Sequence, residues 1–454
     1  MFKIAVPRGA KAIVQGLRFA DYEAYVVGGC VRDSFLQADP EDWDICTSAT
    51  PEEMKEYFSR IAVRTIDTGL KHGTITVDAG DLGKFEVTTF RVDGEYSDNR
   101  HPDTVEFTDS IYKDLARRDF TINAMAYNQA GLIDPFHGLQ DLENEVIRCV
   151  GTPDDRFRED ALRILRAMRF ASIYGFTIEE ETAQSIHRNK GLLEHIAAER
   201  IQSELCKMLR GKNILNVLLE YGDVIATIIP EMGPCIGFDQ HNRFHEYTVY
   251  DHIAHAVANY EGDDVVVKVA LLLHDIGKPH CYTEDEKGGH FHGHGVVSQT
   301  LAADILDRLR FDTQSKKDVL DIVLYHDTVI EPTPKTVRRW LHKLGQKNFA
   351  RLLDVRMADI LAHAKDTQAS RIKRCNALRT LLDIALKEQQ CFQMKDLAID
   401  GHDVMYVFSI SEGKEVGKIL KEALDAVIDG EVENTRPALL RYLFKKSFAE
   451  STMI

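Results

Sequence analysis

The sequence predicts an α+β fold for the N-terminal third of the chain and an all-α fold for the remainder. Within residues 1–150, short runs rich in β-branched residues at 61–63, 74–77 and 85–88 alternate with brief helical stretches. From Arg158 onward the apolar residues recur every three or four positions, as at Leu162, Leu165, Met168 and Phe170. We therefore expect a mixed sheet with helices, followed by helical regions.

Length and punctuation indicate several domains. A chain of 454 residues with 44% hydrophobic content can bury two to four ordinary cores. A turn-rich segment at 151–154 closes the α+β part, and a histidine-rich stretch occupies about 240–365. We expect four regions, at 1–150, 151–225, 226–365 and 366–454.

Composition excludes some classes of protein. No apolar run reaches the roughly 18 residues that span a bilayer, and the first residues lack the apolar core of a signal peptide. The eight cysteines include no C-x-x-C pair, so a reducing, cytoplasmic setting is expected. The net charge of −16 disfavours indiscriminate nucleic-acid binding, whereas basic clusters at 156–169, 335–347 and 371–379 are compatible with selective RNA contact.

The most informative motif is a glycine pair followed by two spaced aspartates. Tyr25–Val27 is expected to form a buried strand, and Gly28-Gly29 lets the backbone approach phosphates closely before a helix begins near Val31. If Asp42 and Asp44 lie on a strand, their carboxylates share one face. Two such oxygen ligands suit Mg²⁺ and a two-metal mechanism. The alternative is a plain glycine turn beside an ordinary acidic loop.

Four motifs in this order resemble one known family. They are 28–33 (GGCVRD), the Asp42/Asp44 pair, 117–124 (RRDFTINA) and 158–163 (REDALR). Together they resemble the class II tRNA nucleotidyltransferases, the CCA-adding enzymes, in their bacterial form. The resemblance covers about residues 20–220 and returns near 422–434. It implies a nucleotidyltransferase head, a helical neck, a tRNA-binding tail, Mg²⁺, and addition of CCA from CTP and ATP to tRNA held by its acceptor and T arms.

The resemblance also implies roles for the phosphate- and sugar-binding residues. Gly29 and Arg32 are expected at the triphosphate, where a guanidinium can bind phosphate oxygens, and Arg118 is expected to meet the phosphates as well. Asp119 and Asn123, four residues apart, are expected on one helical face at the ribose. A competing interpretation is that Asp119 only caps a helix over 120–127.

The third set of residues points to base selection. Cytosine and adenine both present an amine beside an unprotonated ring nitrogen, so Asp160 can accept from the amine while Arg163 donates to the nitrogen. Guanine and uracil present the opposite pattern and leave two buried groups unpaired, at about 1–3 kcal/mol each. Arg166 and Arg169 continue the same spacing, and in the family these positions help to hold the nucleotide. The alternative is an i,i+3 salt bridge between Asp160 and Arg163 on a helix surface.

Other segments of the head carry weaker signals. Glu86 is a candidate third carboxylate near the metals or, equally well, a half-exposed strand glutamate. Residues 91–102 form a loop by their turn chemistry; they resemble the flexible loop of enzymes that add the full CCA. Residues 134–138 resemble the hinge after the head, although a plain turn explains them equally well.

The histidine-rich stretch resembles the HD metal-phosphohydrolase superfamily. His252, the pair His274-Asp275 and Asp359 occur in the order H…HD…D, and residues 270–278 (ALLLHDIGK) are close to the central signature. This resemblance implies a site for Mg²⁺, Mn²⁺, Ni²⁺ or Co²⁺ that activates water against a phosphoester. His294 and His326 are candidates for a second metal, whereas His245, His255, His290 and His292 are equally well explained as core or surface residues.

Several functions fit this pattern. Template-independent CCA addition is the leading hypothesis, with a second phosphohydrolase activity on RNA ends. The alternatives are an enzyme that adds only CC or only A, a poly(A) polymerase, an HD phosphohydrolase with a nucleotide-sensing N-terminal domain, and a non-catalytic RNA-binding module. Intact Asp42 and Asp44 disfavour the last two, because sensing or binding needs no metal pair. The oligomeric state is not predicted.

Overall fold

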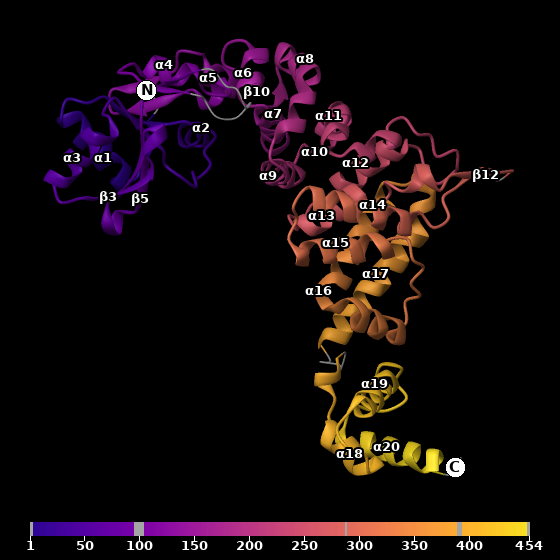
Figure 1. The fold of residues 1–454 in the computed structure, drawn as a ribbon. Helices are drawn as coiled ribbons and strands as arrows, with labels where there is room; N and C mark the ends of the chain where they lie inside the picture. The colour runs from indigo at the N-terminus through magenta and orange to yellow at the C-terminus, as the bar shows by residue number, and fades with distance from the viewer. Residues whose placement is uncertain (1–2, 95–103, 287, 388–392, 452–454) are drawn as a thin grey trace. The chain divides into compact units, whose positions relative to one another are not determined.

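The structure, a computed structural model, describes residues 3–94, 104–286, 288–387 and 393–451 (Figure 1). It divides into two compact units, residues 1–233 and 234–454. Each unit is described by itself below. The predicted division into four regions remains a prediction.

Unit 1 contains a seven-stranded mixed sheet. The strand order is β3-β4-β5-β2-β1-β8-β9, and within this sheet only the β2–β5 pair is parallel. The strands are β1 (Ala24–Val27), β2 (Ile45–Thr47), β3 (Arg64–Gly69), β4 (Thr74–Asp78), β5 (Lys84–Thr89), β8 (Ala126–Asn128) and β9 (Gly131–Ile133). The predicted α+β class is confirmed. The strand expected at 61–63 is wrong in position, because these residues form a turn and β3 begins at Arg64.

Helices and a hairpin complete the sheet domain. The helices are α1 (Arg8–Phe19), α2 (Gly29–Phe35), α3 (Pro51–Arg60), α4 (Ile111–Ala116) and α5 (Gly138–Glu143). Helix α1 buries Ile13, Val14 and Leu17 as an apolar stripe, and Thr50 begins α3 with a capping box to Glu53. The hairpin pairs β6 (Arg91–Asp93) with β7 (Val105–Phe107). Much of the predicted loop over 91–102 lies outside the described residues.

The rest of unit 1 is helical. It contains α6 (Pro153–Glu159), α7 (Leu162–Tyr174), α8 (Glu180–Asn189), α9 (Ala198–Leu209), α10 (Ile214–Glu220) and α11 (Gly222–Ile228), with a short parallel pair of β10 (Val146–Ile147) and β11 (Thr177–Ile178). The single predicted helix from Arg158 is wrong, because Asp160 is extended, with φ −138° and ψ 101°, and separates α6 from α7. Its side chain accepts a hydrogen bond from the Leu162 amide at 3.1 Å, the local bonding by which aspartate favours helix ends.

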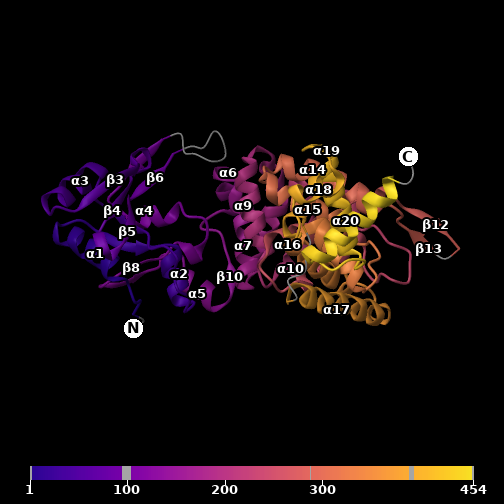
Figure 2. The same cartoon turned by 90° about the horizontal axis from the view of Figure 1, so that it is seen from below.

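The described part of unit 2 is helical apart from one small hairpin, in agreement with the predicted helical character of this part of the chain. Its first helices are α12 (Val249–Asn259), α13 (Val265–Leu273), α14 (His294–Arg308) and α15 (Thr313–Tyr325), with a hairpin of β12 (Thr283–Asp285) and β13 (Gly288–His290). The long helices α16 (Pro334–Leu361) and α17 (Lys365–Lys387) pack side by side (Figures 1 and 2). Helix α13 is buried on all sides, which explains its unbroken apolar sequence.

Helix α16 is interrupted at Gly345. This residue has φ 74° and ψ 167°, a conformation that is essentially restricted to glycine. The half of α16 before Gly345 holds the C-terminal helices, because Arg338 donates to the carbonyl of Ile428 at 2.6 Å and Arg339 pairs with Asp429 at 2.8 Å. The half after it carries Asp359.

The C-terminal helices have a core of their own. They are α18 (Gly401–Phe408), α19 (Lys414–Ile428) and α20 (Arg436–Ser451). Their buried cluster includes Val404, Leu424, Leu439 and Leu443. Among the described residues, no helix combines the length and apolar character needed to cross a membrane.

Candidate functional sites

An acidic edge forms where β2 and β5 run side by side. The parallel register places Ile45 beside Val87, so Asp44 and Glu86, one residue earlier, are also neighbours. Ile45 and Val87 are buried whereas Asp44 and Glu86 are exposed, so these carboxylates lie on the solvent face. We call Asp42, Asp44 and Glu86 the acidic edge.

The placement of the aspartates on a strand is wrong in detail. Strand β2 begins at Ile45, so Asp42 and Asp44 lie in the segment that leads into it. Partial desolvation raises the pKa of Asp44; Arg118 opposes this shift, and Glu86 and Asp42 reinforce it. A carboxylate whose pKa is raised by two neighbouring carboxylates is suited to binding a cation, and the exposure of all three side chains suits Mg²⁺, which keeps several of its waters.

The glycine turn lies beside Arg118. Gly28 has φ 78° and ψ −128° and precedes helix α2, which starts at Gly29. A Cβ at position 28 would lie 2.9 Å from Nη1 of Arg118. A side chain there would therefore displace the guanidinium that also influences Asp44. This close approach explains why the first position of the pair is a glycine.

A chain of polar contacts connects Arg32 to Arg166 through the third motif. Arg32 Nη1 donates to Oδ1 of Asn123 at 2.6 Å, and Nδ2 of Asn123 donates to Oδ1 of Asp119 at 3.0 Å. Nε of Arg166 donates to Oδ2 of Asp119 at 2.9 Å. Burial alone would raise the pKa of Asp119, but Arg166, Asn123 and Arg163 together lower it well below its ordinary value. The structure thus brings four of the predicted nucleotide-binding residues together.

The helix expected over 120–127 is absent. Residues Thr121–Asn123 form a single 3₁₀ turn, and β8 begins at Ala126. Asp119 still accepts from the amide of Phe120 at 2.8 Å and from Asn123, so the side chains meet without an α-helix. The shared helical face and the helix-capping alternative are both wrong, because the chain turns into the sheet here.

Three arginines surround the ring of Phe170 in α7. The guanidinium carbons of Arg32, Arg166 and Arg169 lie 5.0, 5.5 and 4.4 Å from its centroid. Cations at this range are stabilised by the face of an aromatic ring. Phe170 therefore gathers three like charges that would otherwise repel one another, and it produces a concentrated positive region next to Asp119.

Asp160 and Arg163 do not pair with each other. Asp160 accepts from Arg200 of α9, with Nη2 to Oδ2 at 2.9 Å. Arg163 pairs with Glu159 at 2.6 Å, and its Nη2 donates to the carbonyl of Arg117 at 2.9 Å. The surface salt bridge between Asp160 and Arg163 is therefore wrong, and so is the assignment of Asp160 to the helix of Arg163, Arg166 and Arg169. Each residue is instead fixed by a partner of its own.

Two supporting carboxylates were missed by the sequence analysis. Asp114 of α4 is almost fully buried and pairs with Arg117 at 2.8 Å and with Arg118 at 3.3 Å. Glu204 of α9 pairs with Arg169 at 3.1 Å. The spacing of Arg200 and Glu204, four apart in an amphipathic helix, was the available signal, because it places both on one face.

The HD centre, His252, His274, Asp275 and Asp359, assembles from three helices of unit 2. His252 belongs to α12, His274 caps α13, and Asp359 lies in α16. Nε2 of His252 lies 2.9 Å from Oδ1 of Asp359, and Nε2 of His274 lies 3.2 Å from Oδ2 of Asp275. All four ligand atoms lie within 4.8 Å of one another. The structure therefore brings together all four residues of the H…HD…D pattern.

Backbone carbonyls fix the tautomer of every histidine in the HD centre and of the neighbouring second histidine pair, His294 and His326. Because a carbonyl oxygen only accepts, each ring must carry its proton on Nδ1. The Nδ1 donors of His252, His274, His294 and His326 bond Ala362, Leu271, Phe291 and Val323 at 3.2, 2.7, 2.8 and 2.7 Å. Each Nε2 is thereby left to bind an ion, which is the usual arrangement of metal-ligating histidines.

The buried atoms and charges of the HD centre fit a metal. Nε2 of His274 and Oδ1 of Asp275 are buried without a hydrogen bond of good geometry, although Lys278 pairs with the other oxygen of Asp275 at 2.6 Å. Desolvation lowers the pKa of His274, but Asp275 and Asp359 outweigh it and raise the pKa to about 10. Desolvation lowers that of His252 to about 4. A metal would therefore displace a proton from His274.

A second group of ligands lies on the other side of Asp275. Nε2 of His294 and of His326 lie 3.3 and 3.5 Å from Oδ1 of Asp275 and 3.0 Å from each other. Together with Asp275 they form a second cluster of ligand size. A pocket of about 780 Å³ opens onto both clusters. It also contains Arg243 and Arg371, whose guanidinium carbons lie 5.0 and 5.8 Å from the ring of Phe244.

Comparison with known sequences identifies both halves of the chain. A poly A polymerase head domain matches residues 24–148, a probable RNA and SrmB-binding site of polymerase A matches 175–233, and tRNA nucleotidyltransferase domain 2 matches 295–443. The CCA-adding enzyme of Lactobacillus delbrueckii subsp. bulgaricus is 35% identical over 96% of both chains. That of Geobacillus sp. is 34% identical over 96% of both chains.

Solved structures agree with the sequence comparisons. The chain is similar to the Bacillus stearothermophilus CCA-adding enzyme in complex with CTP, at a TM-score of 0.74, with 29% identity, 98% of this chain and 99% of that chain. The Thermotoga maritima CCA-adding enzyme complexed with tRNA has the same fold, at a TM-score of 0.57, with 22% identity and 96% and 94% coverage. With the near full-length identity to the curated relatives, these likenesses show that the chain belongs to the CCA-adding enzyme family of tRNA nucleotidyltransferases.

Proposed function

We propose that unit 1 rebuilds the 3′-terminal CCA of tRNA, without a nucleic-acid template, from CTP and ATP. The observation that carries this proposal is the position of the acidic edge beside Arg118 and the glycine turn. Carboxylates for a metal and cations for a triphosphate then flank the same place. Nucleotidyl transfer needs both at once, because the attacking hydroxyl and the leaving pyrophosphate carry negative charge.

The predicted site residues divide the tasks of this reaction among them. Asp42 and Asp44 hold Mg²⁺, which when bound activates the 3′-hydroxyl and stabilises the leaving pyrophosphate. Gly29, Arg32 and Arg118 bind the triphosphate. Asp119 accepts a hydrogen bond from the ribose 2′-hydroxyl, and Asn123 orients both Asp119 and Arg32. Arg166 and Arg169 supply further positive charge at the nucleotide.

Asp160 and Arg163 choose the base. Asp160 accepts from the amine of cytosine or adenine, and Arg163 donates to the adjacent ring nitrogen. Arg200 and the carbonyl of Arg117 hold these two side chains in place, so that the pattern is presented rigidly. A base with the opposite pattern leaves buried groups unpaired.

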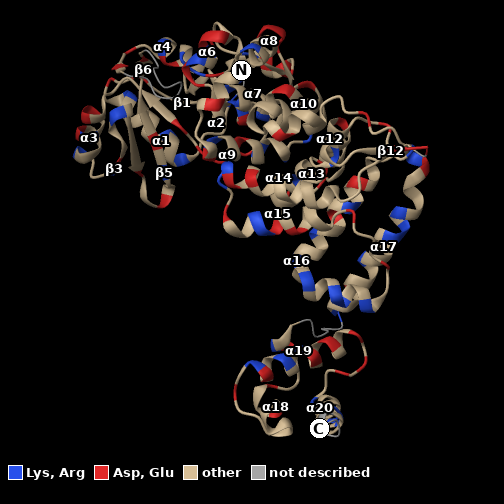
Figure 3. Ribbon diagram, turned by 45° about the vertical axis from the view of Figure 1, so that its right-hand side comes forward, with Lys and Arg blue, Asp and Glu red and all other residues tan. Residues whose placement is uncertain are grey.

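The tRNA is held by its acceptor and T arms along the helical regions. Figure 3 marks basic residues on α16 and α17, of which Arg371, Lys373 and Arg374 form one cluster. Localised cations on an acidic chain favour a structured RNA that approaches in one orientation. The solved relatives with CTP and with tRNA support these partners. A cytoplasmic location and the four-region division belong to the same proposal.

The activity is tested with tRNA that lacks CCA. The full-length protein is incubated with each nucleoside triphosphate alone and with CTP plus ATP, and product length is read on a gel. Three added residues with CTP plus ATP support full CCA addition. Two residues, or one, or a long A tract would instead identify a CC-adding enzyme, an A-adding enzyme or a poly(A) polymerase.

A second function is favoured by the HD centre. We propose that it holds Mg²⁺, Mn²⁺, Ni²⁺ or Co²⁺ and hydrolyses phosphoesters of nucleotides or RNA ends. The fixed tautomers and the unbonded Nε2 of His274 carry this proposal. When bound, the metal lowers the pKa of a water, and Lys278, Arg243 and Arg371 offer cations to the phosphate.

The two activities should separate by mutation. His274→Ala should abolish hydrolysis of a 2′,3′-cyclic or 2′-phosphate substrate and spare CCA addition, whereas Asp42→Ala should do the reverse. Absence of turnover with all four metals, although metal is bound, would leave the HD centre a structural role only.

A further inference from the structure

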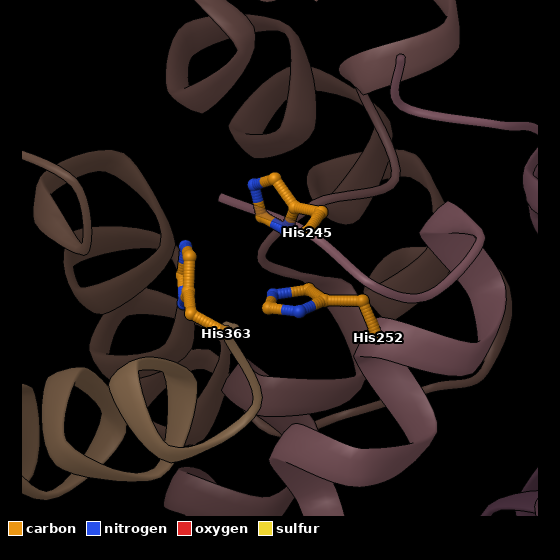
Figure 4. Close-up of side chains that lie close together, drawn as sticks. All are labelled: His245, His252 and His363. Carbon is orange, nitrogen blue, oxygen red and sulfur yellow. The ribbon is translucent and has the colours of Figure 1, made fainter. Parts of the chain in front are cut away.

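Two histidines outside the H…HD…D pattern lie against the HD centre. His245 precedes α12 and His363 follows α16. The ring centroids of His245 and His363 are 4.4 Å apart, and those of His252 lie 4.9 Å from His245 and 5.0 Å from His363. Figure 4 shows the three rings turned toward a common space. At least one ring nitrogen from each lies within 4.8 Å of the others.

The unused nitrogens of these two rings are available as ligands. Nδ1 of His363 donates to the carbonyl of Asp359 at 2.8 Å, so its Nε2 keeps a free lone pair, as in the four histidines described above. Nδ1 of His245 is buried and has no hydrogen-bond partner among the described residues. An imidazole nitrogen that is buried without a partner costs free energy unless something binds it.

We propose that His245, His252 and His363 form a further metal position, the imidazole position, which overlaps the HD centre through His252. The proposal rests on the proposed function, because it assumes that the HD centre binds metal. His252 has one lone pair on Nε2. It can therefore bind an ion in the HD centre or an ion in the imidazole position, but not both at once. The two positions therefore compete for His252.

The ligand sets of the two positions select different ions. The HD centre offers two carboxylates, which suit Mn²⁺ and Mg²⁺, whereas three neutral imidazoles suit Zn²⁺, Ni²⁺ and Cu²⁺. The neutral imidazoles add no negative charge that would attract a cation, so only an ion that forms strong bonds to nitrogen is retained there. Both His245 and His363 line the pocket, which gives the ion access and room for water in its remaining positions.

Simple aromatic packing is the competing explanation. The ring of His245 lies edge-on to His252, at 86°, and tilted by 40° to His363, as packed aromatic rings often do. Packing and metal binding differ in what phenylalanine does. Phenylalanine preserves packing but removes the nitrogen lone pair. At His245, whose Nδ1 has no hydrogen-bond partner among the described residues, this replacement isolates the ligand role. At His363 it also removes the hydrogen bond to the carbonyl of Asp359.

The test compares Zn²⁺ and Mn²⁺ affinity in full-length His245→Phe and His363→Phe, measured by calorimetry. We expect each change to weaken Zn²⁺ binding at least about tenfold, and we expect His245→Phe, which breaks no hydrogen bond to the HD centre in the described part of the chain, to leave Mn²⁺ affinity within about twofold. His255→Phe is the matched control, because His255 also lies in a ring stack, with Tyr247 at 4.0 Å, but outside every ligand cluster. Unchanged Zn²⁺ affinity in both variants, or an equal loss of Zn²⁺ and Mn²⁺ affinity in His245→Phe, overturns the proposal.

A measurement on the unmodified protein covers the case in which a variant fails to fold. The electron paramagnetic resonance spectrum of bound Cu²⁺ should show coupling to three nitrogens, and a spectrum dominated by oxygen ligands overturns the imidazole position. Failure of the HD centre itself looks different. The unmodified protein would then bind no Mn²⁺, or His274→Ala would leave Mn²⁺ affinity unchanged.

Discussion

The acidic edge of unit 1 and the HD centre of unit 2 both contain carboxylates, but the first is exposed to solvent and the second is buried. Asp42, Asp44 and Glu86 are exposed to solvent, and Arg118, which is paired with Asp114, lies close enough to influence Asp44. Asp275 is 1% exposed and His252 and His274 are fully buried, with every imidazole fixed by a backbone carbonyl.

This difference predicts which kind of ion each site takes. Mg²⁺ dehydrates reluctantly and suits a wet edge where substrate phosphates supply further ligands. The buried HD centre, with two imidazoles and two carboxylates, suits an ion such as Mn²⁺ that exchanges most of its water for protein ligands. One site is thus completed by each substrate, whereas the other is largely complete in the protein.

Removal of an acidic-edge carboxylate should have the largest effect. Asp44→Ala should lower the rate of CCA addition by at least about a hundredfold, because charge at the reacting phosphate loses its stabilisation. Single-turnover kinetics with tRNA lacking CCA measures it, and Glu41→Ala, a neighbouring exposed acid, is the control. A rate above roughly a tenth of normal with Mg²⁺ present would remove the metal role of Asp44 and with it the contrast between the sites.

Metal should stabilise unit 2 far more than unit 1. Saturation with Mn²⁺ at about a hundred times its Kd should add about 2.7 kcal/mol to the stability of unit 2, whereas Mg²⁺ without nucleotide should leave unit 1 unchanged. Thermal unfolding of protein that a chelator has freed of metal, measured with and without each added ion, checks this expectation. The His274→Ala protein should lose the shift; an equal shift in that variant would mean that Mn²⁺ binds elsewhere.

Removal of the Asp160 carboxylate should have an intermediate effect, on the selection of the nucleotide base. Asp160→Ala should weaken discrimination against UTP and GTP by about 1–3 kcal/mol, roughly 5- to 150-fold, because the bonds that reject them are lost. Incorporation of each nucleotide singly, compared by kcat/KM, measures it. Asp155→Ala, which replaces an exposed acid of α6 whose ion-pair partner is the exposed Arg158, is the matched control. A lower rate with the same selectivity would indicate that Asp160 only supports the structure through Arg200.

The smallest effect concerns acid stability in unit 1. The folded-state pKa of Asp119 is lowered, so its contribution to stability is present above its ordinary pKa of about 3.9 and is lost as the pH falls through the lower folded value. Arg166 is one-third exposed, so solvent screening reduces this contribution. Asp119→Asn should therefore be less stable near neutrality and less sensitive to pH below about 4. Thermal unfolding midpoints of the unmodified protein and of Asp119→Asn, measured at several pH values, test this expectation. Parallel pH dependences of the two midpoints would contradict a stabilising role of the Asp119–Arg166 ion pair.

The sequence predicted the membership of both sites better than their local structure. Motif order identified the residues that meet around Asp119 and Asp275. The helix boundaries failed at Asp160 and at 120–127, because a side chain bonding to nearby amides and a turn into the sheet overrode helical spacing. Such competition is decided by tertiary contacts that a linear pattern does not contain.

The partners that fix the sites could be predicted only in part. His363 follows Asp359 by four residues and could have been placed on the same side from spacing alone. His245 and Asp114 gave no such signal, because His245 lies in an irregular segment and a buried aspartate resembles an exposed one in sequence. Their roles depend on how distant segments meet.

Gly345 divides helix α16 into two shorter helical halves that need not share one axis. One half carries Asp359, a ligand of the HD centre, and the other half contacts the C-terminal helices through Arg338 and Arg339. The backbone torsion angles of Gly345 therefore set the direction of one half of α16 relative to the other. A residue with a Cβ in that conformation would be strained by about 1–3 kcal/mol. A single glycine thus allows the two packed halves of α16 to run in different directions.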